Sequence, residues 1–400
     1  MNILLANLTK MVDDTGGLAK VTSAFANEMQ RRGHTVSVVY SDVKEGAFYY
    51  PLNQGIPAYD ICHYKGQTIS FPWYLKMKRE LLRTVSKQKA RTVNSDFEEK
   101  YLLNNLQDVV DEVKPQVIVS YQPAASKMLL CDLQVAVPVI TMSHGDPEDY
   151  FHIYPKKEIP SLEKSAVCQV LLPSFAQHIH DHLPDVNTVV IGNAIPQFTE
   201  QADLQKEKEH YTIVSVGRLT KNHKRPHLLI QAFARLAARY PDWQVEFWGD
   251  VDIRTYYEEL KLIIKRKNLQ DRVFLKGTSN KIPQILQRCD IFAFPSAYEG
   301  FGLALGEAMS MGLPAVGYKS CSAVNELIVD GVNGFLCEEG AEALAAKLEK
   351  LMADRTLRAA MGQAARESMK QYAPEAIWDA WEKLLEETGN HTSNLADNSI

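Results

Sequence analysis

The chain has 400 residues, of which 46% are hydrophobic and 23% are charged, and its net charge is −5. This length predicts two domains, each with its own core. The slight negative charge argues against nucleic-acid binding, which needs a concentrated basic face. The six cysteines show no CxxC spacing, which indicates reduced thiols in a cytosolic protein.

The first residues, Met1 to Leu5, lack the charged region and the apolar core of a signal peptide. No apolar run approaches the roughly 20 residues that a membrane-spanning helix needs. We therefore expect a cytoplasmic protein without a transmembrane segment.

The N-terminal half begins with a β-α-β pattern: a strand over residues 3–8, a helix over 18–32 and a strand over 35–40. This order predicts a parallel sheet. Gly16 and Gly17 lie at the first turn, where they suit either a phosphate site or tight packing of helix on strand. Further apolar runs predict strands over residues 117–121, 138–142, 167–172 and 188–191.

Histidines mark two places in this half. His144 follows the strand over 138–142, at the end where open α/β sheets place ligands, although a lone histidine there is more often structural. His178, His180 and His182 have the spacing of a shared helix face and raise the question of a metal. No cysteine or well-placed carboxylate completes the set, so an exposed, partly titrating face is favoured.

Residues 71–91 combine aromatic and basic side chains. Phe71, Trp73 and Tyr74 precede a basic run in which only Glu80 is acidic: Lys76, Lys78, Arg79, Arg83, Lys87, Lys89 and Arg91. Aromatic anchors that lead into a basic helix indicate contact with an anionic membrane surface. A solvated basic helix explains the pattern equally well.

A polar, charged stretch over residues 197–210 is the predicted interdomain linker. After it, a strand over 211–216 ends in Gly217 and Arg218, and Lys224 opens a helix. Two cations at a strand-to-helix turn suit a pyrophosphate, although two surface cations are the default interpretation without further context. Lys221 is a minor rival of Lys224 for this role. Later strands are predicted over 243–248, 273–277, 290–294 and 314–318, with Gly249 and Gly277 at two of their ends.

Residues 294–309 read as a strand, a glycine-rich turn and a helix, which aims free backbone N–H groups at an anion. Glu299 precedes the turn at Gly300 and Gly302. Glu307 follows on an apolar helix, so we expect its carboxylate near the interior, hydrogen-bonded to a group such as the paired hydroxyls of a ribose. For either glutamate alone, a structural role is the more common one.

The string from Pro295 and Ser296 through Glu299-Gly300-Phe301-Gly302 to Glu307 resembles the Glu-x7-Glu signature of retaining GT-B glycosyltransferases of family 4, the glycosyl transferases group 1. Gly217-Arg218-Leu219 with Lys224 is similar to the second signature of that family, with one extra residue. The resemblance implies a GT-B α/β fold, with two Rossmann-like parallel-sheet domains facing a central cleft. The implied parts are an acceptor-binding domain over 1–196, the linker over 197–210, a nucleotide-sugar-binding domain over 211–373, a helix over 374–388 that packs back on the N-terminal domain, and a flexible tail over 389–400.

The resemblance also implies a reaction. A sugar, with a UDP-sugar as the preferred donor, moves to an acceptor hydroxyl with retained anomeric configuration, in the assembly of surface polysaccharide, lipopolysaccharide or another glycoconjugate. The implied catalytic residues are Glu299, His144, Arg218 and Lys224. The implied donor-binding residues are Gly16, Gly17, Gly217, Gly249, Gly277, Gly300, Phe301, Gly302, Leu303 and Glu307.

No cofactor or metal is expected, because sites of the resembled family work without one. Asp250 and Asp252 imitate the DxD metal motif, which belongs to a different glycosyltransferase fold. The implied partners are the nucleotide-sugar and a saccharide or lipid-linked acceptor, at the inner face of the cell membrane if residues 71–91 bind lipid. Two alternatives remain: a GT-B epimerase that binds the same donor, and an inactive nucleotide-sugar-binding scaffold.

Overall fold

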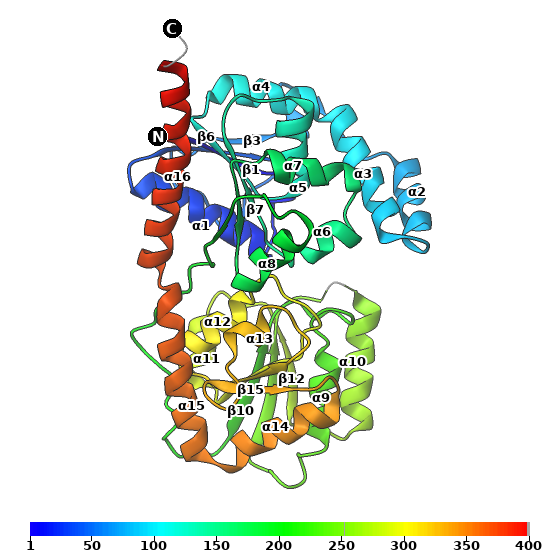
Figure 1. Cartoon of the computed structure of the whole chain (residues 1–400). Helices are drawn as coiled ribbons and strands as arrows, with labels where there is room; N and C mark the ends of the chain where they lie inside the picture. Colours follow the sequence, from blue (N-terminus) through cyan, green and yellow to red (C-terminus); the bar gives the residue numbers. More distant parts are fainter. Residues whose placement is uncertain (252, 398–400) are drawn as a thin grey trace. The chain divides into compact units, whose positions relative to one another are not determined.

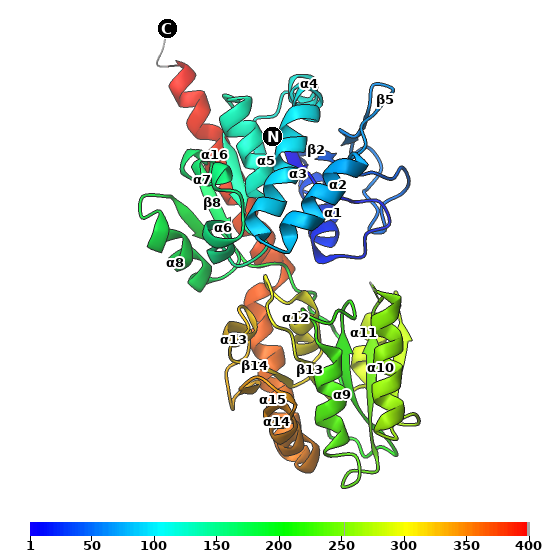
Figure 2. The same cartoon turned by 90° about the vertical axis from the view of Figure 1, so that its right-hand side faces the viewer.

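The computed structural model describes residues 1–251 and 253–397, and it divides into two compact units (Figures 1 and 2). The N-terminal unit comprises residues 1–192 together with the chain from Ile377 onward, and the C-terminal unit comprises residues 193–376. Each unit is a parallel sheet with helices on its faces. Within the described residues, no helix is both long and apolar enough to cross a membrane.

The sheet of the N-terminal unit has seven parallel strands in the order β3-β2-β1-β6-β7-β8-β9. The central strands are buried on both faces, which is why they are continuous apolar runs. The strands are β1 (Asn2–Asn7), β2 (Thr35–Tyr40), β3 (Ala58–Asp60), β6 (Val117–Ser120), β7 (Val139–Met142), β8 (Val167–Val170) and β9 (Thr188–Val190), with a small antiparallel hairpin of β4 (His63–Tyr64) and β5 (Gln67–Thr68) outside the sheet. The helices are α1 (Gly17–Arg31), α2 (Trp73–Arg83), α3 (Lys87–Tyr101), α4 (Leu103–Val113), α5 (Pro123–Lys127), α6 (Glu148–His152), α7 (Ile159–Lys164) and α8 (Pro173–His182), with a π-helical turn η1 (Met128–Asp132) and a 3-10 turn η2 (Lys156–Glu158).

The sheet of the C-terminal unit has six parallel strands in the order β12-β11-β10-β13-β14-β15. The direction of strand succession reverses between β10 and β13, and ligands of such sheets bind at the carboxyl ends of the strands at that point. The strands are β10 (Tyr211–Val216), β11 (Trp243–Trp248), β12 (Val273–Gly277), β13 (Ile291–Phe294), β14 (Ala315–Tyr318) and β15 (Gly334–Cys337). The helices are α9 (Pro226–Ala234), α10 (Arg254–Arg266), α11 (Ile282–Arg288), α12 (Leu303–Ser310), α13 (Val324–Leu327), α14 (Ala341–Ala353), α15 (Arg355–Ser368) and the 3-10 turn η3 (Met369–Tyr372). The last helix, α16 (Pro374–Asp397), begins in this unit and belongs to the N-terminal unit from Ile377 onward.

These strand orders confirm the two Rossmann-like parallel sheets, but three predicted segments differ. Residues 71–91 do not form one basic helix, because the chain breaks at Thr84–Ser86 into α2 and α3. The predicted linker over 197–210 packs on the C-terminal unit, since Ala202 and Leu204 are buried, and the units separate after Gly192.

The third difference concerns the C-terminus. Helix α16 continues through the first residues of the predicted tail, as far as Asp397, and residues 398–400 of that tail lie outside the described residues. The helix packs on α1: the rings of Trp378 and Trp381 meet the ring of Phe25 edge to face, at 5.7 and 4.9 Å. Two apolar anchors therefore fasten α16 to the N-terminal unit.

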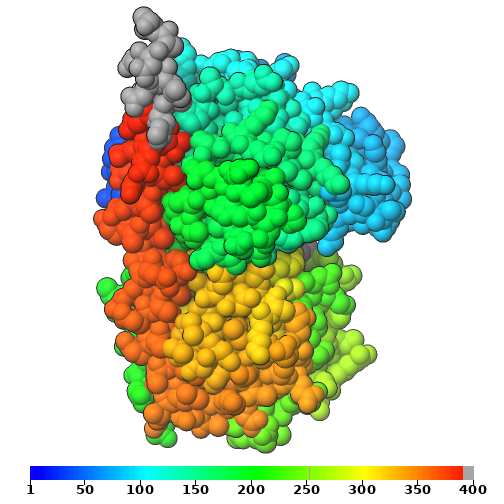
Figure 3. Space-filling model, viewed as in Figure 1, coloured from blue at the N-terminus to red at the C-terminus, as the bar shows by residue number. Residues whose placement is uncertain are grey.

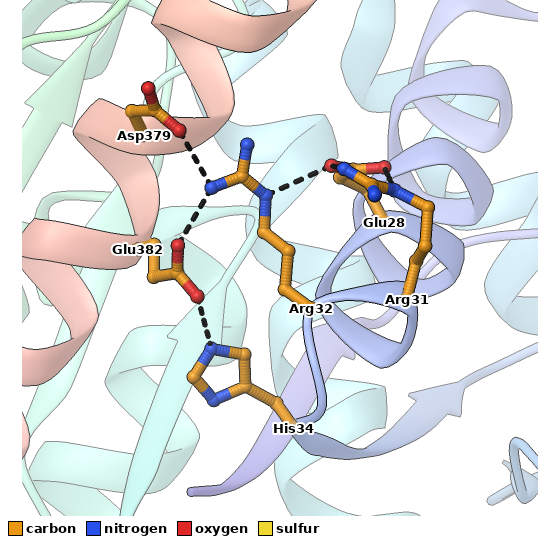
Figure 4. Close-up of polar contacts among 6 residues, drawn as sticks. All are labelled: Glu28, Arg31, Arg32, His34, Asp379 and Glu382. Atoms are coloured by element: carbon orange, nitrogen blue, oxygen red, sulfur yellow. Dashed lines mark hydrogen bonds and ion pairs between the residues drawn. The ribbon is translucent and has the colours of Figure 1, made fainter.

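Charged groups add to this contact, as Figure 4 shows. The Arg32 guanidinium lies 2.7 Å from carboxylate oxygens of both Asp379 and Glu382, and its Nε donates to Glu28 at 2.9 Å. The other carboxylate oxygen of Glu382 lies 3.0 Å from Nε2 of His34. His34, which follows α1, thus contacts the C-terminal helix.

Two glutamates of the N-terminal unit lie near one another: Glu98 on α3, which is half-buried, and Glu158 in η2, which is buried. Burial, together with the nearby Glu158 charge, raises the pKa of Glu98 to about 8. Burial also raises the pKa of Glu158 to about 7, against the Ser95 hydroxyl and the Lys157 ammonium. Both carboxyls are therefore protonated in the folded protein at mildly acidic pH.

This pair makes stability depend on pH. The folded pKa values lie above the unfolded value of about 4.3, so the stabilisation is complete below that value and is lost as pH rises through about 7–8. We expect the free energy of unfolding, measured with urea, to fall between pH 5.5 and 8.5, by about 1.4 kcal/mol for each pKa unit. Glu158→Gln should flatten this slope.

The neighbouring Glu99 provides a control of opposite sign. Hydrogen bonds from Lys127 and Lys157 lower the pKa of Glu99 to about 2, so its contribution is lost only as pH falls through that range. Glu99→Gln should leave the slope between pH 5.5 and 8.5 unchanged. An equal pH slope for wild type and Glu158→Gln would refute the buried acid pair.

Candidate active site

Three glycine turns meet at the carboxyl ends of neighbouring strands in the C-terminal unit. Gly249, with φ of 149°, follows β11, and a Cβ there would lie 2.1 Å from the carbonyl oxygen of Gly217, which follows β10. The backbone N–H of Gly249 donates to the carbonyl of Gly277 at 2.8 Å. The close approach requires glycine at position 249.

A lysine and a glutamate come together between the β10–α9 and β13–α12 turns. Lys224 donates a hydrogen bond from Nζ to the Glu299 carboxylate, and its ammonium lies 4.4 Å from the centre of the Phe294 ring. A Cβ on Gly217 would meet Lys224 Cε at 3.2 Å, so the glycine leaves room for the lysine stem. The alternative cation, Lys221, instead pairs with Glu259 on α10 at 2.8 Å.

His223 adds a second contact to Glu299. Its Nε2 lies 3.4 Å from Oε1 of Glu299 and 2.8 Å from the carbonyl oxygen of Tyr298, and its ring stacks on the Tyr298 ring at 4.2 Å. Glu299 is only 8% exposed. Burial opposes its ionisation, but the Lys224 ammonium and His223 outweigh burial and lower the pKa of Glu299 to about 2.

Arg225 ties the two turns together. It adopts a left-handed conformation, with φ of 49°, at the start of α9. Its guanidinium donates to the carbonyls of Pro295 and Ser296, both at 3.0 Å, and to Glu339 at 2.9 Å. Sequence reasoning missed Arg225 and His223, although both adjoin Lys224, because nothing in the local sequence shows contacts to residues some 70 positions later.

The N-terminus of α12 has no side-chain cap. The N-cap residue is Gly302, with φ of 81°, and as a glycine it has no side chain that could cap the helix. The first-turn N–H groups of such a helix favour an anion. The side chain of Phe301 is buried against Tyr372, with ring centres 5.0 Å apart, so only its backbone is available at this turn.

Two further predicted residues lie on the same turns. Arg218 is half-buried and directly follows Gly217. Glu307, on α12, is half-buried rather than enclosed, which corrects the expectation of an interior carboxylate. Its neighbours Leu305 and Ala308 take the buried face of the short helix.

In the N-terminal unit, the predicted glycine pair begins α1. Gly16 is the N-cap residue and Gly17 the first helical residue, and no side chain caps the helix or places a negative charge in its first turn. A Cβ on Gly16 would meet the Asp14 carboxylate at 3.0 Å. This turn is therefore a second uncapped helix N-terminus.

His144 lies in the loop after β7. The ring of His144 stacks on that of Tyr121, with centres 5.1 Å apart, and Nε2 is buried without a hydrogen-bond partner among the described residues. Burial lowers the pKa of His144 to about 3, so the imidazole is neutral. The loop is held by Tyr150, which donates to Ser143 at 2.9 Å, and by His178, which lies 2.6 Å from Asp146.

The three histidines of α8 turn to different partners. His178 contacts Asp146, His180 lies 3.1 Å from the Val186 carbonyl, and His182 lies 3.3 Å from Glu148. The ligand-type atoms of Glu148, His152 and His182 lie within 4.8 Å of one another at the surface, a grouping that helical spacing along α8 could not reveal. In the DxD-like turn, the Asp250 carboxylate accepts from the N–H of Val251 at 2.8 Å, while Asp252 lies outside the described residues.

Comparison with known proteins shows which fold the chain has and which family model it matches. The structure of Staphylococcus aureus TarM in complex with fondaparinux, α-GlcNAc-glycerol and UDP superimposes with a TM-score of 0.74 over 96% of this chain and 100% of that one, at 15% identity. The fold is therefore GT-B. Residues 196–368 match the model of the family described as glycosyl transferases group 1.

Curated relatives agree over part of their length. An uncharacterized glycosyltransferase of Haemophilus influenzae is 31% identical over 178 residues, which cover 44% of this chain and 49% of the relative. The amylovoran biosynthesis glycosyltransferase AmsD of Erwinia amylovora is 27% identical over 223 residues, or 53% of this chain and 60% of the relative. The chain thus matches less than two thirds of each relative.

Proposed function

We propose that the protein is a retaining glycosyltransferase that moves a sugar from a nucleotide-diphosphate sugar, preferably a UDP-sugar, to an acceptor hydroxyl. The observation that carries this proposal is the Lys224–Glu299 pair, held between two glycine turns at the switch point of the sheet and adjoining the uncapped N-terminus of α12. An ammonium and free N–H groups at one place suit a diphosphate leaving group.

In this proposal, the donor diphosphate binds Arg218, Lys224 and the N–H groups of Gly302 and Leu303. Their positive charge stabilises the negative charge that develops as the sugar leaves. Lys224 is paired with Glu299, so the diphosphate and the carboxylate would share one ammonium. In this arrangement, the ion pair with Glu299 would hold the Lys224 ammonium in place for the diphosphate.

The remaining roles follow from the resemblance. Glu307, half-buried on α12, would accept hydrogen bonds from the ribose hydroxyls. Glu299 and the adjacent backbone, including Gly300 and Phe301, would hold the donor sugar, and His144 would also reach that sugar. The neutral imidazole of His144, with an unpartnered Nε2, suits a hydrogen bond to a sugar hydroxyl.

The relatives suggest the donor and the pathway. The TarM structure contains UDP, and the Erwinia relative is named for amylovoran biosynthesis. We therefore propose a UDP-sugar donor and a saccharide or lipid-linked acceptor in surface polysaccharide or glycoconjugate assembly. We expect no metal in the reaction, because the proposed diphosphate contacts come from cations of the chain itself.

Thermal unfolding with nucleotides tests the proposal. Wild type is heated with UDP, GDP, ADP or CMP, each with and without magnesium. At about 100 times its dissociation constant, a bound nucleotide should stabilise by about 2.7 kcal/mol, which raises the midpoint by several degrees. We expect UDP alone to do so, without magnesium. Glu307→Ala should lose most of the shift.

Glu342→Ala is the matched control, since Glu342 is exposed on α14 of the same unit. It should keep the full shift. Stabilisation by GDP instead of UDP would correct the donor. No shift with any nucleotide would refute the transferase, and a shift that strictly requires magnesium would refute the metal-free mechanism.

A further inference from the structure

We propose that α2 and the first turn of α3 form a surface that binds an anionic lipid bilayer. The lipid-facing surface comprises Trp73, Tyr74, Met77, Leu81, Val85, Lys76, Lys78 and Lys89. This inference does not depend on the transferase reaction, because lipid binding can be measured without donor or acceptor.

The apolar part of this surface is unusually open. Helix α2 contains no buried residue, and Trp73 is 72%, Met77 57% and Leu81 68% exposed. Spacing of four residues places these three side chains on one face of the helix. Together with Tyr74 and Lys78 they line a depression in the surface.

The same helix is also attached to the protein by its other side. Leu75 packs against the buried cluster that includes Phe97, and the Arg79 guanidinium lies 5.3 Å from the centre of the Phe71 ring. Helix α2 thus has one apolar face toward the protein and another away from it. The outward face is not needed to hold the helix in place, and contiguous exposed apolar side chains of this kind mark interaction sites.

Charge indicates which partner covers this face. Lys76, Lys78 and Lys89 are exposed and form no ion pair within the described part of the chain. The one acidic residue of α2, Glu80, is engaged by Arg79 at 3.1 Å and Arg83 at 3.0 Å. The whole chain is negative, at −5, so this basic concentration is local.

Aromatic and aliphatic side chains flanked by lysines fit the interface of a bilayer with anionic headgroups. A second copy of the chain fits less well, because a symmetric contact would bring the two sets of lysines together. Figures 1 and 2 place α2 at the edge of the N-terminal unit, outside α3, and Figure 3 shows this edge open to the surroundings.

The position of the surface connects it to the His144 loop. At the start of α3, Gln88 donates to the Tyr154 carbonyl at 2.8 Å, and Arg91 lies 3.9 Å from the centre of the Tyr154 ring. Tyr154 follows α6, the helix that comes after the His144 loop. A bilayer bound at α2 would therefore lie near the segment around Tyr154, which follows the His144 loop in the chain.

Sedimentation with vesicles tests the proposal. The full chain is mixed with vesicles of phosphatidylcholine, with or without 30% phosphatidylglycerol, at low and high salt. We expect at least tenfold tighter binding to the anionic vesicles at low salt. Lys76→Glu with Lys78→Glu should remove this preference, because each basic residue near the surface contributes about fivefold. Trp73→Ala with Leu81→Ala should abolish the binding that survives high salt.

Leu262→Ala with Lys267→Glu is the matched control, since both positions are exposed in the C-terminal unit. It should bind as wild type does, and all variants should unfold at the wild-type temperature because none removes a buried side chain. Equal binding by wild type and the double lysine variant would overturn the proposal, as would no binding to either vesicle. A wild-type dimer that Trp73→Ala converts to a monomer, without vesicle binding, would assign the face to a second copy instead.

Discussion

Lys224→Ala is expected to lower kcat/KM about 10²–10³-fold, because one preorganised donor to a developing charge contributes roughly that much. The measurement is UDP release from whichever UDP-sugar is turned over, with water as acceptor if no saccharide acceptor is known. The loss should fall mainly on kcat, since the negative charge on the diphosphate grows in the transition state.

Lys221→Ala is the matched control, because Lys221 lies three residues away and pairs with Glu259 rather than Glu299. Its turnover should stay within about twofold of wild type, as for a surface substitution. Loss of activity in Lys221→Ala, with normal turnover in Lys224→Ala, would transfer the proposed role to Lys221.

Lys224→Ala also leaves Glu299 buried beside His223 alone, which should destabilise the C-terminal unit by up to about 3–5 kcal/mol. Adding Glu299→Gln should restore much of that stability, because the unpaired charge is removed. Activity should not return with it. Stability and turnover can therefore be separated by comparing the single and double variants.

The candidate site could be predicted where its residues are close in sequence. Glu299, Gly302 and Glu307 share one turn and helix, so their spacing alone indicates a site. The sequence favoured Lys224 over Lys221, but the partner of each lysine could not be predicted, because it depends on the path of the loop before α9. The burial of Glu307 was overestimated, since its apolar neighbours in sequence occupy a different face of α12.

The same reasoning applies to the fold. The central strands were predictable because burial on both faces makes them continuous apolar runs, as in β1 and β10. The boundary between α2 and α3 could not be predicted. The apolar side chains of α2 face outward, but they have the same helical periodicity as the apolar side chains of a buried helix face. The extension of α16 past Thr388 was also missed, since a polar segment after Gly389 has the composition of a tail.

Trp381→Ala should destabilise the N-terminal unit by about 3–5 kcal/mol, the usual cost of removing a buried tryptophan. Trp381 is only 2% exposed and lies edge to face with Phe25 of α1, at 4.9 Å. The ion pairs of Arg32 with Asp379 and Glu382 cannot replace this contact, because partly exposed ion pairs contribute little.

A two-unit chain need not unfold in one step, so amide hydrogen exchange is the appropriate measurement. Peptides from α1 and α16 should exchange faster in Trp381→Ala, while those from β10 and β13 keep the protection of wild type. Trp73→Ala removes the same side chain from an exposed position of the same unit and should change exchange within about 0.5 kcal/mol. Unchanged protection of α1 in Trp381→Ala would mean that α16 does not stabilise the unit through this contact.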